Sequence, residues 1–210
     1  MSAWSDLGLR TRTALLIGLV TLGLLWLPPL LQRLALLVWG ALLLREAVRL
    51  VEAAATAALY KLLFLFYVGL GIAATLWLVG LKHDTISGLA LLVVSAWIVD
   101  SAAYLGGRLI GGPKLARAIS PNKTWSGLLS GVAALLAAAW LVGFGLWSLV
   151  LALSIAPIMQ AGDLTQSVMK RRAGLSDSGN ILPGHGGWLD RYDGALAAAP
   201  VWVLLLEFAI

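Results

Sequence analysis

The sequence predicts an all-α fold: a polytopic integral membrane bundle of about seven transmembrane helices with two loops on the cytoplasmic side. Three observations predict it. Hydrophobic residues make up 60% of the 210 residues and charged residues only 12%, which is too apolar for a water-soluble domain. Apolar runs recur at close to the ~20 residues that a helix needs to cross a bilayer. Lys and Arg gather between alternate runs, as they do on the cytoplasmic side of membrane proteins.

The apolar runs give the expected helices in order. They lie at residues 14–31, 34–53, 60–81, 86–106, 125–142, 146–162 and 194–210. The first run follows two arginines like a secretory signal peptide, but it ends in Leu-Pro-Pro-Leu-Leu without a small-residue cleavage site. We therefore expect it to stay in the protein as an anchor. The second run is the least secure of the seven.

The basic residues predict the orientation. With the N-terminus in the cytoplasm, all fifteen Lys and Arg residues except Arg33 and Lys82 fall on the cytoplasmic side. The sizeable loops 107–124 and 163–193 then lie on the same side and can face each other. We divide the chain into N-terminal transmembrane helices at 1–85 and a transmembrane domain at 86–210 that carries both loops.

The second loop concentrates polar groups that suit a divalent cation. The chain has no cysteine, so a metal would be held by oxygen or by one of two histidines. One polar stripe forms if the sixth helix continues past the membrane, with Asp163, Gln166, Ser167 and Lys170 on the same face. Asp190 and Asp193 lie one turn apart if the last helix begins there. These three carboxylates could converge on Mg²⁺, or they could be solvated charges paired with neighbouring Lys and Arg residues.

Asp100 interrupts the fourth apolar run. An unpaired charge costs at least ~2.5 kcal/mol near the bilayer centre, so an acid inside a membrane segment is a functional candidate. A structural partner, such as a lysine or a helix terminus, is the alternative. Tyr104 lies one turn further on and shares the face of Asp100.

Two glycine-containing segments suit anions. Residues 106–127 combine five glycines with Ser-Pro-Asn-Lys-Thr-Trp, and Lys123 lies where a helix is expected to start, which favours anion binding. Alternatively, Ser120 and Thr124 are only helix caps and Lys123 only follows the positive-inside rule. The turn Pro-Gly-His-Gly-Gly at 183–187 allows close approach to a phosphate or nucleobase, with His185 as a hydrogen-bonding scaffold more than a ligand or base.

These motifs resemble the phosphatidate cytidylyltransferase (CDP-diacylglycerol synthase) family. The family signature runs Ser-x-x-Lys-Arg, four residues, Lys-Asp, then Pro-x-His-Gly-Gly-x-x-Asp-Arg-x-Asp. The matching residues are Ser167, Lys170, Arg171, Asp177, Pro183, His185, Gly186, Gly187, Asp190, Arg191 and Asp193. The pattern Asp-x-x-Ala-Tyr-x-x-Gly from Asp100 and the stretch at 120–125 also match, so the resemblance covers roughly 90–195. Ser176 stands where the signature has lysine, and Ser126 where Glu is usual.

The resemblance implies a multi-pass protein of the inner membrane that transfers the cytidylyl group of CTP to phosphatidate, with its N-terminus and active site in the cytoplasm. It also implies that the N-terminal helices at 1–85 are fewer than the family usually has. It implies Mg²⁺, with a second, monovalent cation left open, and leaves a homodimer open; no nucleic-acid partner is expected. The implied metal ligands are Asp163, Asp190 and Asp193, which with Lys170 form the catalytic set. The implied substrate-binding residues are Lys123, Asn122, Ser167, Arg171, Arg191, Asp100, Asp177 and His185.

Two other classes of protein remain open at the level of sequence. A CTP-dependent lipid kinase acting on a polyprenol-type alcohol would share the bundle and the nucleotide loop but would transfer the γ-phosphoryl group. A transporter or ion pathway would use Asp100 and Asp163 as membrane-embedded sites, although the acidic residues gather in the loops instead of lining several spans. Nucleotide-dependent metal binding would separate the enzymes from the transporter.

Overall fold

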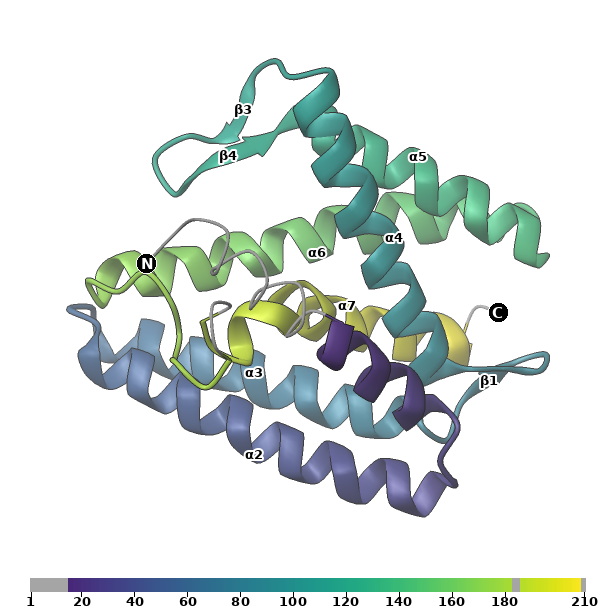
Figure 1. Cartoon of the computed structure of the whole chain (residues 1–210), viewed down its shortest axis with the longest axis horizontal. Helices are drawn as coiled ribbons and strands as arrows, with labels where there is room; N and C mark the ends of the chain where they lie inside the picture. Colours follow the sequence, from purple (N-terminus) through teal and green to yellow (C-terminus); the bar gives the residue numbers. More distant parts are fainter. Residues whose placement is uncertain (1–14, 183–185, 209–210) are drawn as a thin grey trace.

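The computed structural model describes residues 15–182 and 186–208 and is largely helical (Figure 1). A first apolar helix, Leu15–Leu25, is followed by six longer ones. These are α2 (Pro29–Ala53), α3 (Ala58–Leu78), α4 (Gly88–Leu109), α5 (Trp125–Val142), α6 (Trp147–Arg172) and α7 (Leu189–Phe208). Each of the seven predicted runs therefore corresponds to a helix, and the all-α prediction is confirmed.

Helices α3, α4, α5 and α6 are long and apolar enough to cross a membrane, so the chain is a multi-pass membrane protein. Among the described residues these four satisfy both criteria, against the seven spans expected. The first helix is short, while α2 and α7 are long but interrupted by charge. The charged residues of α2 are Arg33, Arg45, Glu46, Arg49 and Glu52, and those of α7 are Asp190, Arg191, Asp193 and Glu207.

Helix α7 lies at the centre of the bundle and packs against α3, α4 and α6 (Figure 1). Its side chains Leu196 and Trp202 are buried in the two main apolar clusters. The approach of α6 depends on Gly162, because a Cβ atom there would lie only 2.7 Å from the carbonyl oxygen of Asp193. Close packing at this point places the polar end of α6 beside the first turn of α7.

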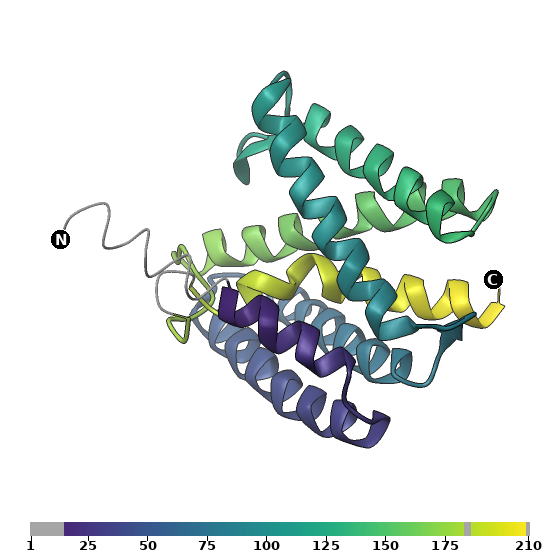
Figure 2. The same ribbon diagram turned by 45° about the vertical axis from the view of Figure 1, so that its right-hand side comes forward.

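Two short hairpins lie at different ends of the bundle (Figures 1 and 2). Strands β1 (Lys82–His83) and β2 (Ile86–Ser87) pair near the end of α7, and strands β3 (Lys114–Ala116) and β4 (Ser120–Thr124) pair above α6. Lys123 lies near the end of β4 and directly before Thr124, so it lies beside the start of α5, as expected, but not within the helix. Thr124 is the cap of α5, since its hydroxyl oxygen accepts a hydrogen bond from Gly127 N at 3.1 Å.

Helix α6 extends to Arg172, well past the predicted end of the membrane run at residue 162. Its last turn consists of Lys170, Arg171 and Arg172, whose positive charges offset the negative end of the helix dipole. The conditional prediction of a polar stripe on a continued helix is therefore confirmed. The start of α7 at Leu189 likewise places Asp190 and Asp193 one turn apart.

Candidate active site

A polar cavity of about 290 Å³ lies where β4, α4 and α6 meet the first turn of α7. The predicted site residues that line it are Asp100, Lys123, Asp163, Lys170, Asp177, Asp190, Arg191 and Asp193. They come from both predicted loops and from the fourth helix, which confirms that the two loops face each other. The cavity concentrates five carboxylates and three cations in one small volume.

Lys123 and Asp163 join the two loops across the cavity. The Lys123 Nζ atom lies 2.5 Å from Asp163 Oδ2 and donates a longer hydrogen bond, 3.4 Å, to the carbonyl oxygen of Gln160. Ser167 Oγ donates to Asp163 Oδ1 at 3.3 Å. The Asp163 side chain keeps 38% of its surface exposed, so it still faces the cavity. Asp163 is therefore open to a ligand, whereas the Asp190 side chain is only 5% exposed.

Asp190 is the most heavily hydrogen-bonded acid of the site. Its Oδ1 accepts from Lys170 Nζ at 2.7 Å and from Gln166 Nε2 at 3.0 Å. Its Oδ2 accepts from Ser178 N at 2.8 Å, Ser178 Oγ at 3.0 Å and Gly187 N at 3.0 Å. Burial raises the pKa of Asp190, but the hydrogen bonds from Lys170, Gly187 and Ser178 outweigh burial, and the pKa is lowered overall. Asp190 thus stays ionised and organises the loop before α7.

Asp193 lies one turn further along α7 and is fixed through its backbone. Tyr67 donates its hydroxyl proton to the Asp193 carbonyl oxygen at 2.8 Å, and Gly194 N donates to Asp193 Oδ1 at 2.7 Å. The Asp193 carboxylate interacts electrostatically with Asp163 and Asp100. Three acids therefore share one electronegative side of the cavity.

Not every predicted residue lines the cavity. Asn122 and Arg171 are exposed and lie outside its walls, and Ser167 reaches it only through its bond to Asp163. His185 lies outside the described residues. Sequence reasoning missed Glu46, a buried acid of α2 that contacts the start of α7. A signal was present: Glu46 falls on the buried stripe of α2 at helical spacing with Leu43 and Leu50.

The carboxylates of the cavity suit a hard cation that takes most of its other ligands from substrate phosphates and water. Within residues 15–182 and 186–208, no three His, Cys, Asp or Glu side chains gather so as to hold a metal by themselves. Mg²⁺ does not need such a cage, because it usually takes one or two carboxylates, several waters and substrate phosphate oxygens. Asp163, with 38% of its side chain exposed, suits that mode better than Asp190, which is 5% exposed and accepts five hydrogen bonds.

A second, apolar cavity of about 540 Å³ adjoins the polar one. Asp100, Arg191 and Gly194 line both cavities. The remaining walls come from the first helix, α2, α4 and α7, and most of the lining side chains are aliphatic or aromatic. The site therefore combines a charged chamber with an apolar one that meets it at Asp100 and Arg191.

The comparisons with known proteins agree with this geometry. The model of the cytidylyltransferase family matches residues 52–209. A phosphatidate cytidylyltransferase of Brucella suis is 40% identical over 212 residues, which cover 96% of this chain and 77% of that protein. Proteins of the same name from Staphylococcus haemolyticus and Haemophilus influenzae are each 38% identical, covering 71% and 61% of this chain and 59% and 49% of their own lengths. The chain belongs to the cytidylyltransferase family.

Proposed function

We propose that this protein is a phosphatidate cytidylyltransferase, which converts CTP and phosphatidate to CDP-diacylglycerol and pyrophosphate. The observation that carries the proposal is the junction of the two cavities at Asp100 and Arg191. A nucleotide triphosphate suits the charged chamber. A lipid with an anionic headgroup and acyl chains suits the position where that chamber meets the apolar one. The relatives' names support the same pair of substrates.

The reaction requires charge neutralisation more than covalent chemistry. A phosphate oxygen of phosphatidate attacks the α-phosphorus of CTP, the bond from that phosphorus to the bridging oxygen breaks, and pyrophosphate leaves. Both reactants are anions, so cations near the developing charge lower the barrier. Lys123 and Arg191 are placed at the cavity to hold phosphates, and Lys170 is placed to fix Asp190. Mg²⁺, with Asp163 and Asp193 as its proposed ligands, would supply further positive charge to the phosphate oxygens. Asp190, the third ligand expected from the sequence, already accepts five hydrogen bonds, and we propose that it holds the loop beside them.

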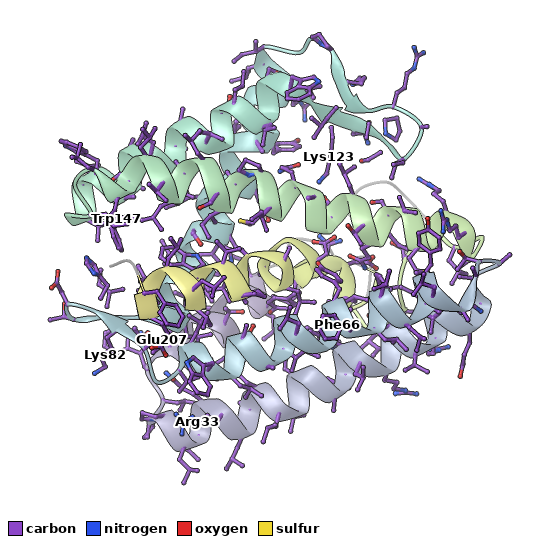
Figure 3. The ribbon with its side chains drawn as sticks, turned by 180° about the vertical axis from the view of Figure 1, so that it is seen from behind. Arg33, Phe66, Lys82, Lys123, Trp147 and Glu207 are labelled. Atoms are coloured by element: carbon purple, nitrogen blue, oxygen red, sulfur yellow. The ribbon has the colours of Figure 1, made fainter. Side chains whose placement is uncertain are left out.

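The distribution of charge supports a cytoplasmic site. Arg33 and Lys82, the two cations predicted to lie outside, gather with Glu207 at one end of the bundle, away from Lys123 (Figure 3). Arg33 lies close to the turn after α3, because a Cβ atom at Gly80 would be 3.4 Å from its guanidinium. By the positive-inside rule, this distribution favours a polar cavity that faces the cytoplasm, where CTP is available.

The test is a pyrophosphate-release assay on the detergent-solubilised protein. We expect release that requires CTP, phosphatidate and Mg²⁺ together and that stops with EDTA. CTP labelled at the γ-phosphate separates this activity from the lipid kinase: a cytidylyltransferase places the label in pyrophosphate, a kinase in the lipid. Folded protein that gives neither product would contradict the proposal.

Filling the apolar cavity should weaken lipid use selectively. Ala35 lines the cavity from α2 and is exposed to it, so Ala35→Phe would occupy space proposed for an acyl chain. We expect the KM for long-chain phosphatidate to rise about tenfold, with the KM for CTP unchanged. Ala41→Phe is the matched control, since Ala41 is exposed on the same helix outside the cavity. Equal KM values in the two variants would exclude this chamber as the lipid site.

A further inference from the structure

Glu46 is a buried acid of α2 that faces the start of α7. Its side chain is 1% exposed. Its Oε1 accepts a hydrogen bond from Trp188 N at 3.0 Å, and its Oε2 accepts from Leu189 N at 2.9 Å and from Ser178 Oγ at 2.7 Å. Glu46 also lies before the stretch matched by the family model, which begins at residue 52. It therefore lies outside the part of the chain that the family model matches.

Glu46 accepts a hydrogen bond from a backbone N–H group in the first turn of α7. The first N–H groups of an α-helix have no partner within the helix, and a carboxylate near them is stabilised by the helix dipole. Leu189 is the first residue of α7, and its N–H donates to Glu46. Asp190, in the same turn, accepts from Gly187 N. Two carboxylates, one from α2 and one from α7 itself, thus fix where α7 begins.

Ser178 connects these two carboxylates. Its hydroxyl oxygen lies 2.7 Å from Glu46 Oε2 and 3.0 Å from Asp190 Oδ2. Close approach on the Glu46 side depends on two glycines: a Cβ atom at Gly179 would lie 2.7 Å from Glu46 Oε1, and one at Gly187 would clash with Glu46 Oε2. The segment before α7 is therefore packed directly onto the Glu46 carboxylate.

We propose that Glu46 is a positioning residue for cytidylyl transfer. It acts through the first turn of α7, which carries Asp190, Arg191 and Asp193 into the polar cavity, and it does not itself line that cavity. The inference rests on the proposed function for its catalytic consequence. Its structural part, the clamp between α2 and α7, stands on the contacts alone.

The first variant is Glu46→Gln. It keeps the size of the side chain but replaces one acceptor oxygen with an NH₂ group, which would face a backbone N–H donor. We expect kcat to fall by about 10- to 100-fold, the loss typical when a supporting partner of a site is removed, with a smaller change in the KM for CTP. We also expect faster hydrogen–deuterium exchange of the backbone amides at 186–191, measured by mass spectrometry.

Two controls on the same helix separate positioning from stability. Gln32 is buried at the other end of α2 and donates to the carbonyl oxygen of Leu25 at 3.1 Å, so Gln32→Met removes a buried hydrogen bond away from the polar cavity. We expect it to lower Tm and leave kcat unchanged. Glu52 is exposed, and Glu52→Gln should change neither quantity. If Glu46→Gln lowers Tm as Gln32→Met does and keeps the wild-type kcat, the positioning role is wrong.

A milder variant covers the case in which Glu46→Gln does not fold. Ser178→Ala removes the link to Asp190 and leaves both backbone bonds to Glu46, so we expect about a fivefold loss of kcat. Unchanged kcat in this variant would also overturn the positioning role. Wild-type protein that releases no pyrophosphate would defeat the proposed function instead. The exchange experiment then still decides on the clamp, since equal exchange at 186–191 in wild type and Glu46→Gln would refute it.

Discussion

Asp163→Asn is expected to reduce pyrophosphate release from CTP and phosphatidate by at least about 100-fold, the scale of loss seen when an electrostatic group is removed from an active site. The substitution keeps the shape of the side chain but removes the charge that pairs with Lys123 and that we assign to the metal. Both the ion pair across the cavity and the proposed metal contact would be weakened. The measurement is kcat at saturating Mg²⁺, together with the Mg²⁺ concentration needed for half-maximal rate.

Asp84→Asn is the matched control for this substitution. Asp84 is exposed in the turn between β1 and β2, near the opposite end of the bundle (Figure 1). Its φ of 51° lies in the left-handed region, which asparagine tolerates well. We expect wild-type activity and Tm. An Asp163→Asn protein with more than about a tenth of the wild-type kcat would remove Asp163 from the catalytic set.

Asp190→Asn is expected to abolish turnover and also to loosen the loop before α7. The carboxylate accepts five hydrogen bonds, from Lys170, Gln166, Ser178 and Gly187. An asparagine would place an NH₂ group against some of these donors, and a buried donor left without an acceptor costs about 1–3 kcal/mol. We expect at least a 100-fold loss of kcat with a lower Tm. The lower Tm is expected from the broken hydrogen bonds; the loss of the negative charge by itself would leave the protein folded.

Asp177→Asn provides the comparison for the structural part of this effect. Asp177 lines the same cavity but is exposed, and the described hydrogen bond to its side chain comes from the neighbouring Ser176 at 2.6 Å. Its Tm should match that of the wild type. If Asp190→Asn retains both the Tm and the activity of the wild type, the Asp190 carboxylate is needed for neither the fold nor the reaction, and its assignment to the active site is wrong.

The helices could be predicted from the sequence because their apolar runs are long and continuous. The run at 125–142 coincides with α5, and the run at 60–81 lies within a few residues of α3. The continuation of α6 to Arg172 could be predicted only as a condition, because hydropathy marks the apolar part of a helix and not the polar turns beyond the membrane. The hairpin of β3 and β4 could not be predicted, because its strands are short, contain proline and lack a regular apolar alternation.

The charged residues of the site were predictable in type but not in their partners. A count of basic residues placed both loops on one side, which is how Lys123 and Asp163 could be expected to meet. No sequence pattern showed that Asp190 would be saturated by hydrogen bonds while Asp163 stays accessible. Glu46 was overlooked because an acid among arginines looks like an ordinary surface charge, although its helical register put it on the buried stripe.

The packing of Gly179 and Gly187 onto Glu46 has a consequence for how relatives of this protein diverge. A side chain at either glycine has no room while a glutamate occupies position 46. Loss of the glutamate, conversely, would leave the segment before α7 without the group it packs against. Positions 46 and 179 should therefore vary together: relatives that keep the acid should keep Gly179, and those that replace it should be free to change it. Gly187 should stay glycine in both groups, because a Cβ atom there would also lie 2.7 Å from the backbone nitrogen of Gly179.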